Sequence, residues 1–137
     1  MVAFESRPIH FHDMTSPLAL MVYENLLPGS QLADRMKEQG YRVIVRAGSD
    51  GLVEQAVREM PLVVIMDLAS KQGDLCPAIR ELKSNPATSH IPVLAFSNNQ
   101  NASLQTAASE AGAAMVASDR AILAQLPALL EQLLRVE

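Results

Sequence analysis

The stretch PLVVIMDLAS at residues 61–70 joins an unbroken apolar run to a carboxylate. Five apolar residues, Leu62 to Met66, precede Asp67 without the polar alternation that marks a half-exposed strand. Such a run is typical of a central strand in a parallel sheet, because helices cover that strand on both faces. The carboxylate that ends the run is therefore expected at the edge of the sheet where the parallel strands end, which is where binding sites of such folds lie.

The rest of the chain alternates short apolar runs with segments of helical periodicity. Strands are predicted at 18–22, 42–46, 62–67, 91–97 and 113–117, and helices at 30–39, 50–60, 73–85, 102–112 and 126–136. Ser30 and Asp74 are the predicted caps of the first and third helices. This strict alternation predicts an α/β fold, a doubly wound parallel sheet with helices on both faces. We expect one domain at 17–137 after an irregular N-terminal extension at 1–16.

The composition of the 137 residues is that of a globular protein, with 49% apolar and 19% charged residues. A net charge of −4 without a Lys/Arg cluster argues against a nucleic-acid partner and an anionic membrane surface. No apolar run reaches the roughly 20 residues of a membrane span, and no signal peptide is recognised. The single cysteine, Cys76, excludes a disulfide framework. These features predict a cytoplasmic protein.

Polar groups follow three of the predicted strands. Glu24 comes after the first strand, Asp67 ends the third and Ser97 ends the fourth. Because parallel strands end at the same edge of the sheet, we expect these side chains to converge. Carboxylates suit Mg²⁺ and a hydroxyl suits a phosphoryl oxygen. The alternative for Asp67 is structural, since Asp after a strand often hydrogen-bonds the following turn.

The sequence around Asp67 resembles the receiver domain of bacterial two-component response regulators. Residues 61–97, and within them NPATSHIPVLAFS at 85–97, carry the strongest likeness, which extends from Leu18 to Leu134. The motif EAGA at 110–113 fits the same family. The resemblance implies the flavodoxin-like (CheY-like) fold with five parallel strands in the order 2-1-3-4-5.

The resemblance also implies a role for each matching residue. Asp67 falls at the phosphoacceptor position, and Ser97 at the position that hydrogen-bonds the phosphoryl group. Glu24, Asp67 and the backbone carbonyl of Ala69 fall where the family binds Mg²⁺. The implied partners are a histidine kinase or phosphotransfer protein and a downstream protein that contacts the helices at 102–112 and 126–136. The leucines of the last helix leave open a homodimer through the same face.

Three positions depart from the family pattern. Tyr23 replaces the first acidic residue, Asp119 with Arg120 beside it replaces the lysine, and Val116 replaces the switch aromatic. Like charges ~4 Å apart repel by several kcal/mol near a protein surface, so Mg²⁺ binding is expected to be weak and phosphorylation of Asp67 slow or short-lived. Two hypotheses follow: a phosphorylated single-domain receiver, and a pseudo-receiver that acts as a protein-interaction module.

Other motifs carry less information. AGSDG at 47–51 lacks the spacing and the lysine of a P-loop, and no nucleophile is paired with a base, so we expect no enzymatic activity. His10, His12 and Asp13 are interpreted as surface residues of the N-terminal extension, because further metal ligands at regular spacing are missing.

Overall fold

The computed structural model describes residues 16–69, 74–97 and 102–134. Five parallel strands form one sheet: β1 (Leu18–Val22), β2 (Arg42–Arg46), β3 (Val63–Asp67), β4 (Val93–Ser97) and β5 (Met115–Ser118). Their order is β2-β1-β3-β4-β5, so the predicted fold and the central place of the strand that ends in Asp67 are confirmed. His10, His12 and Asp13, with most of the predicted N-terminal extension, lie outside the described residues.

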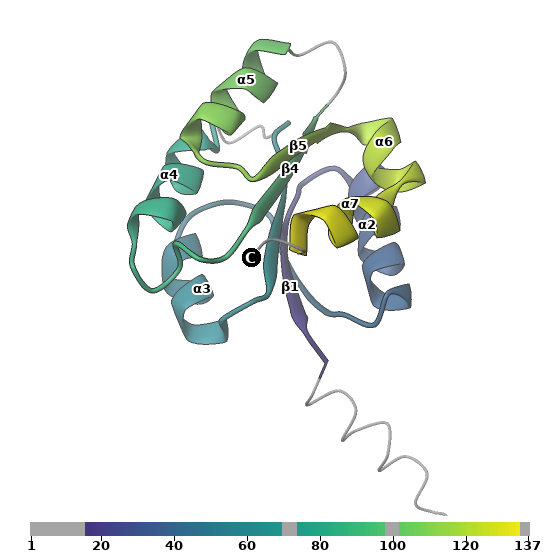
Figure 1. Cartoon of the computed structure of the whole chain (residues 1–137), viewed down its shortest axis with the longest axis horizontal. Coiled ribbons are helices and arrows are strands. Elements are labelled where there is room, and N and C mark those ends of the chain that lie inside the picture. The colour runs from purple at the N-terminus through teal and green to yellow at the C-terminus, as the bar shows by residue number, and fades with distance from the viewer. Residues whose placement is uncertain (1–15, 70–73, 98–101, 135–137) are drawn as a thin grey trace, which may run out of the picture.

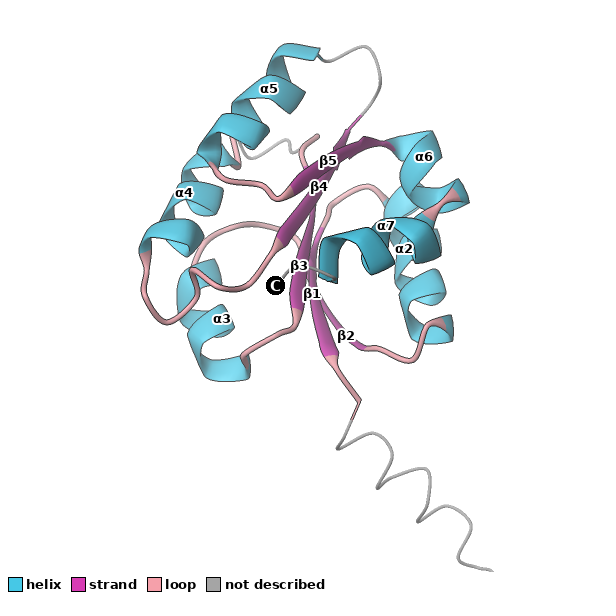
Figure 2. Cartoon of the chain, viewed as in Figure 1, coloured by secondary structure: helices cyan, strands magenta, loops and turns pink. Residues whose placement is uncertain are grey.

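Six helices in the described ranges cover the two faces of the sheet (Figures 1 and 2). They are α2 (Leu26–Glu38), α3 (Leu52–Glu59), α4 (Cys76–Ser84), α5 (Ala102–Ala111), α6 (Asp119–Ala124) and α7 (Leu126–Leu134). Helices α3, α4 and α5 lie on one face, and α2, α6 and α7 lie on the other. None of these helices has the length and apolarity that a bilayer crossing requires.

The core consists of two apolar layers separated by the sheet. Leu20, Val64 and Met66 belong to the layer under α3, α4 and α5. Met21 and Ile65 belong to the layer under α2, α6 and α7, because successive side chains of a strand point to opposite faces. Every residue of β1, β3 and β4 is buried. The polar residues at the ends of these strands are thus held by a covered, rigid platform.

The helices differ most from the prediction at the start of α2 and before α7. The first helix begins at Leu26, not after Ser30, so the prediction of Ser30 as its N-cap is wrong. Leu27 has non-helical dihedral angles, and Pro28, whose fixed φ suits a first helical turn, follows it. A short separate helix, α6, precedes α7. Leu75 is the N-cap of α4, and Asp74, the predicted cap, stands one residue earlier and accepts from the Cys76 N–H through Oδ1 at 2.9 Å.

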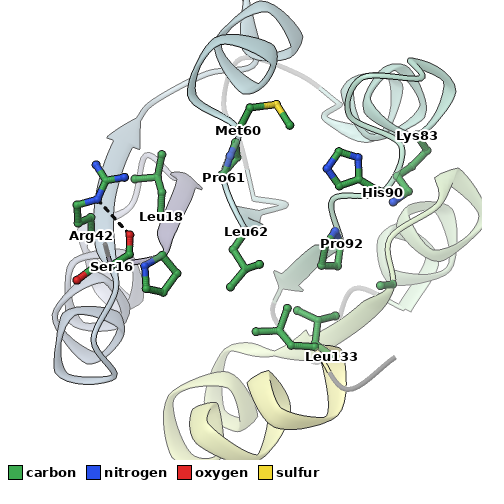
Figure 3. Close-up of a pocket in the computed structure, with 13 residues that line it drawn as sticks. Ser16, Leu18, Arg42, Met60, Pro61, Leu62, Lys83, His90, Pro92 and Leu133 are labelled. Carbon is green, nitrogen blue, oxygen red and sulfur yellow. Dashed lines mark hydrogen bonds between the residues drawn. The ribbon is translucent and has the colours of Figure 1, made fainter. Parts of the chain in front are cut away.

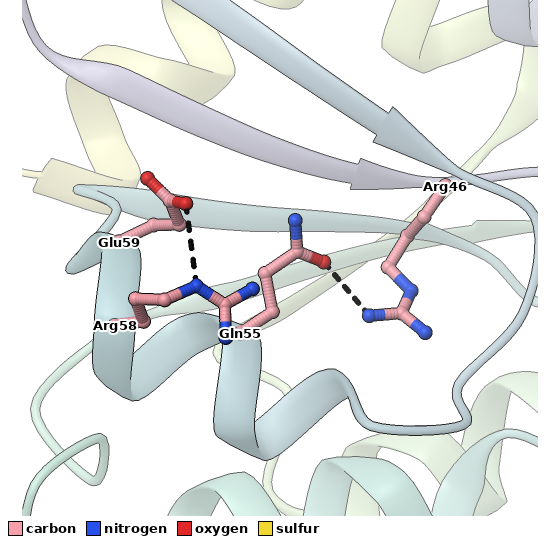
Figure 4. Close-up of polar contacts among 4 residues, drawn as sticks. All are labelled: Arg46, Gln55, Arg58 and Glu59. Atoms are coloured by element: carbon pink, nitrogen blue, oxygen red, sulfur yellow. Dashed lines mark hydrogen bonds and ion pairs between the residues drawn. The ribbon is translucent and has the colours of Figure 1, made fainter.

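The loop between β2 and α3 is fixed by a single arginine. Arg46 Nε donates to the carbonyl of Gly48 at 2.7 Å and its Nη1 donates to Gln55 Oε1 at 2.7 Å. Its Nη2 also donates to the carbonyl of Asp50. Figure 4 shows the contact with Gln55 beside an exposed ion pair between Arg58 and Glu59. This loop is therefore held by a side chain of the strand before it.

The two-layer packing predicts the effect of shortening a buried side chain on a central strand. Ile65→Ala removes a fully buried side chain and should lower the free energy of unfolding by about 2–5 kcal/mol. Val45→Ala on the edge strand β2, where Val45 is 46% exposed, should cost less than about 1 kcal/mol. Urea unfolding of both variants measures the difference, and equal losses would contradict the packing described here.

Candidate functional site

The candidate site lies where the strands end. Asp67 and Ser97 are the last residues of β3 and β4, and Glu24 and Asn25 follow β1. Because β1 and β4 flank β3, the sheet brings these groups to one edge, as the sequence predicted. Asp67 is 3% exposed and Ser97 is 1% exposed, so both side chains lie in the protein interior, not on the open rim.

Asp67 is held by two hydrogen bonds from nearby loops. The Ala69 N–H donates to Asp67 Oδ1 at 2.9 Å, which is the turn predicted as the structural alternative. Asn25 Nδ2 donates to Asp67 Oδ2 at 3.5 Å and to the carbonyl of Ala69 at 3.2 Å. The Asn25 amide therefore lies between the carboxylate of β3 and the loop that follows it.

Asn25 is the site residue that the sequence analysis missed. It stands at the N-cap position of α2, but its side chain makes no cap hydrogen bond there. The amide is engaged with Asp67 and Ala69 instead. The available signal was its position directly after Glu24 at a strand end, where loop residues of an open α/β sheet face the binding crevice.

The electrostatic surroundings make Asp67 a weaker acid than usual. Burial raises the pKa of Asp67, and the hydrogen bonds from Ala69 and Asn25 offset part of that increase. The charges of Asp119 and Glu24 raise the pKa of Asp67 further. None of these neighbours is a cation, so none of them offsets the negative charge of Asp67.

Asp119 is a second acid of the site and is partly buried. It is the first residue of α6, whose start is fixed by Ser118 Oγ accepting from the Ala121 N–H at 3.0 Å. Asp119 Oδ1 is buried and has no hydrogen-bond partner within the described part of the chain, and burial raises the pKa of Asp119. The lysine position of the resemblance is thus occupied by an acid whose charge acts on Asp67.

Tyr23 packs against helix α2. Its ring lies against the apolar layer under α2. Gly29 on α2 approaches so closely that a Cβ at this position would overlap the Tyr23 ring. The residue at the first acidic position of the resemblance therefore contributes its ring to the packing of α2.

The arrangement fits a magnesium ion only in part. Asp67 and the carbonyl of Ala69 provide the hard oxygens that Mg²⁺ prefers, and Glu24 lies close enough to shift the pKa of Asp67. However, the Asn25 amide already donates to both oxygens. Within the described residues, no three His, Cys, Asp or Glu side chains are grouped so that they could hold a metal ion. The Asn25 amide and a cation would therefore compete for the same oxygens.

Comparison with solved structures settles the fold. A response regulator from Chloroflexus aurantiacus has a TM-score of 0.81 at 20% identity over 89% of this chain and 100% of its own. The receiver domain of a sensor histidine kinase from Pseudomonas aeruginosa, with magnesium in its active-site cleft, has a TM-score of 0.79 at 20% identity over 89% of this chain and 100% of its own. The chain has the receiver-domain fold.

A third receiver structure agrees with this result. The BeF3-activated receiver domain of RstA from Klebsiella pneumoniae has a TM-score of 0.75 at 21% identity over 87% of this chain and 99% of its own. No protein-family model and no curated protein matches the sequence. At 20–21% identity the likeness to these three structures is one of receiver fold.

The leucines of α7 serve the core of the receiver fold. Leu126, Leu130 and Leu133 are buried, and Leu129 and Leu134 pack against the same layer. The large exposed hydrophobic residues in the described ranges lie elsewhere: Leu26, Leu27, Val45, Val57, Met60 and Leu62. Most of the apolar stripe of this helix is therefore packed against the sheet, as predicted, and the homodimer through this face stays a prediction.

The contact between Tyr23 and Gly29 predicts that the effect of Gly29→Ala on stability depends on whether the Tyr23 ring is present. Gly29→Ala should lower stability by about 1–3 kcal/mol, because its methyl group overlaps the Tyr23 ring. In a Tyr23→Ala background the same change should be neutral or stabilising by up to about 1 kcal/mol, since Ala is the better helix former. Chemical unfolding of the four proteins gives the coupling, and an equal effect in both backgrounds would refute the contact.

The buried charge of Asp67 predicts a stabilising substitution. The folded-state pKa of Asp67 lies above its unfolded value, so the ionised carboxylate lowers stability at neutral pH, and this cost vanishes below about pH 3.9. Asp67→Asn should raise stability at pH 7 on the order of 1 kcal/mol, or about 3 °C in Tm. The gain should shrink as the pH falls toward 4.

Thermal unfolding across this pH range checks the prediction for Asp67. Asp34→Asn, at an exposed position of α2, is the matched control and should leave Tm nearly unchanged. A destabilised Asp67→Asn protein at pH 7 would show that the hydrogen bonds outweigh burial and like-charge repulsion.

Proposed function

We propose that this chain is a signalling module of receiver fold that acts through protein contacts, with inefficient phosphorylation at Asp67. The observation that carries the proposal is the Asn25 amide, which donates to Asp67 and to the carbonyl of Ala69. The family's magnesium ion would use these same oxygens. An amide in that place satisfies the oxygens without bringing the positive charge that phosphoryl transfer requires.

The charges around Asp67 support the same proposal. A phosphoryl group on a side chain brings about −1.5 to −2 charges at neutral pH. Glu24 and Asp119 already act on Asp67 with negative charge, and Asp119 stands where the family has its lysine. Transfer from a phospho-histidine would thus build up charge beside two acids, and only a divalent cation that displaces Asn25 would offset it. We expect Mg²⁺ to bind weakly for this reason.

The second candidate function is a phosphorylated receiver. It is favoured by the position of Ser97 at the end of β4, beside the strand that carries Asp67, where a hydroxyl could donate to a phosphoryl oxygen. In this case a histidine kinase or phosphotransfer protein is the phosphodonor. In both cases the output is contact with a downstream protein, and neither includes catalysis on a small substrate.

An apolar pair beside the site supports a role in protein contacts. Leu26 and Leu27 are 68% and 71% exposed and directly follow Asn25. Two neighbouring leucines this exposed are unfavourable in water unless a partner covers them. Leu26 and Leu27 therefore place an apolar contact surface next to Asn25, the residue that would respond to a metal ion or a phosphoryl group at Asp67.

Incubation with acetyl phosphate and Mg²⁺ followed by intact-protein mass measurement tests the proposal. The unchanged chain should carry a phosphoryl adduct on only a small fraction of molecules, and Asp67→Asn should carry none. Asp119→Lys replaces a repelling charge with an attracting one, so it should raise the adduct at Asp67 by roughly tenfold or more. Asp34→Lys makes the same change of charge on the exposed face of α2 and should have little effect.

The two candidate functions give opposite results in this experiment. A stoichiometric adduct on the unchanged chain that disappears in Asp67→Asn would overturn the pseudo-receiver proposal and establish the phosphorylated receiver. An Asp119→Lys protein with no more adduct than Asp34→Lys would show that Asp119 does not control the site.

A further inference from the structure

A second concave site lies at the opposite edge of the sheet from Asp67. It is a cleft of about 790 Å³ at the amino ends of the strands (Figure 3). Leu18 and Arg42 begin β1 and β2, and Leu62 and Pro92 directly precede β3 and β4. Strands of five residues place this cleft roughly 15 Å from the Asp67 site. Its volume is in the range of small-molecule sites.

The floor of the cleft is apolar because of its prolines. Pro17, Pro61 and Pro92 stand at the starts of three neighbouring strands and line the cleft. Proline has no backbone N–H, so these strand starts present ring carbons where other residues would present hydrogen-bond donors. Leu62, which is 44% exposed, extends this apolar floor (Figure 3).

The ionisable side chains along the cleft are basic. Arg42, Lys83 and His90 line it, and none of the lining residues is an Asp or Glu, in a chain whose net charge is −4. Figure 3 shows Lys83 and His90 on one wall and Arg42 on the other. Backbone carbonyls hold the two cations, because Lys83 Nζ donates to Ile91 at 2.9 Å and Arg42 Nε donates to Ser16 at 3.3 Å. Both cations have further N–H groups for a ligand.

Met60 at the rim has an unfavourable backbone conformation. It is the C-cap of α3 with φ of 50°, in the left-handed region that favours glycine. Its side chain is 51% exposed and lines the cleft (Figure 3). A long apolar side chain at a position better suited to glycine adds apolar surface to the cleft at a cost in backbone energy, which points to use of that surface.

We propose that this cleft binds a small amphipathic carboxylate with a medium-length apolar chain. The carboxylate is held at the wall formed by Lys83 and His90, and the apolar chain lies along Leu62 toward Leu18. Charge complementarity favours this ligand, since the basic groups surround an apolar floor. The proposal concerns the edge of the sheet remote from Asp67 and does not depend on the function proposed for that residue.

Other occupants complement the cleft less well. Ser16 and Leu134, at the two ends of the described chain, line the cleft. Residues 1–15 include two acids, one arginine and two histidines, and this mixture does not match a basic cleft. A second copy of this chain, whose net charge is −4, would have to insert an acidic and apolar segment that protrudes from its surface. Two of the large exposed hydrophobic residues in the described ranges, Leu62 and Met60, belong to the cleft itself and so are not such a segment.

Titration of the full chain with decanoate, followed by isothermal calorimetry and amide chemical shifts, tests the proposal. One molecule should bind with a Kd on the order of 100 µM and shift the amides of Leu62 and His90. Lys83→Met keeps the aliphatic stem but removes the charge, and it should weaken binding roughly tenfold or more. Lys37→Met, at an exposed position of α2, is the matched control and should bind normally. Thermal unfolding establishes that each variant is folded.

Four results would overturn the proposal. The first is the absence of saturable binding by the folded chain, and the second is equal binding by Lys83→Met and Lys37→Met. The third is tenfold tighter binding when Phe4 and Phe11 are both changed to Ser, which would identify the chain's own N-terminal segment as the occupant. The fourth is a ligand-free dimer that Leu62→Glu abolishes, which would identify a second copy. Unchanged binding by Asp67→Asn would show that the two edges act separately.

Discussion

The burial of a carboxylate at the end of a fully covered strand is the constraint on which the functional edge of this molecule depends. Asp67 is 3% exposed because β3 is central and both of its faces are packed under helices. A buried carboxylate needs hydrogen bonds or a cation. Here Ala69 and Asn25 supply hydrogen bonds, while Asp119 and Glu24 add negative charge. The conformations of the loops after β1 and β3 are linked through this one side chain.

The hydrogen bonds of the buried Asp67 also connect it to residues at the protein surface. The Asn25 amide is a neutral group that contacts Asp67 and Ala69 at once, and Leu26 and Leu27 follow it on the surface. The buried carboxylate of Asp67 is thereby separated from the exposed apolar side chains of Leu26 and Leu27 only by the Asn25 residue that precedes them.

The fold could be predicted from the sequence because its signals are local. The run from Leu62 to Met66 specifies a covered strand, and alternating periodicity specifies a parallel sheet, so Asp67 and Ser97 fall at one edge whatever the loops do. The role of Asn25 could not be predicted, because it rests on a contact between residues 42 positions apart. The start of α2 was missed for a similar reason: Ser30 offers a good cap locally, but the chain turns earlier, at Leu27 and Pro28.

The two edges of the sheet carry opposite charge. The apolar packing between them explains why the fold remains stable with these charges at its edges. Acids gather at the carboxyl ends of the strands, while Arg42 and Lys83 lie at the amino ends. Both layers of the core are apolar and every residue of β1, β3 and β4 is buried, so neither group of charges is needed to hold the strands together. Different polar residues at the Asp67 edge are therefore compatible with the same fold, because its stability resides in the apolar layers and not in the polar groups at either end.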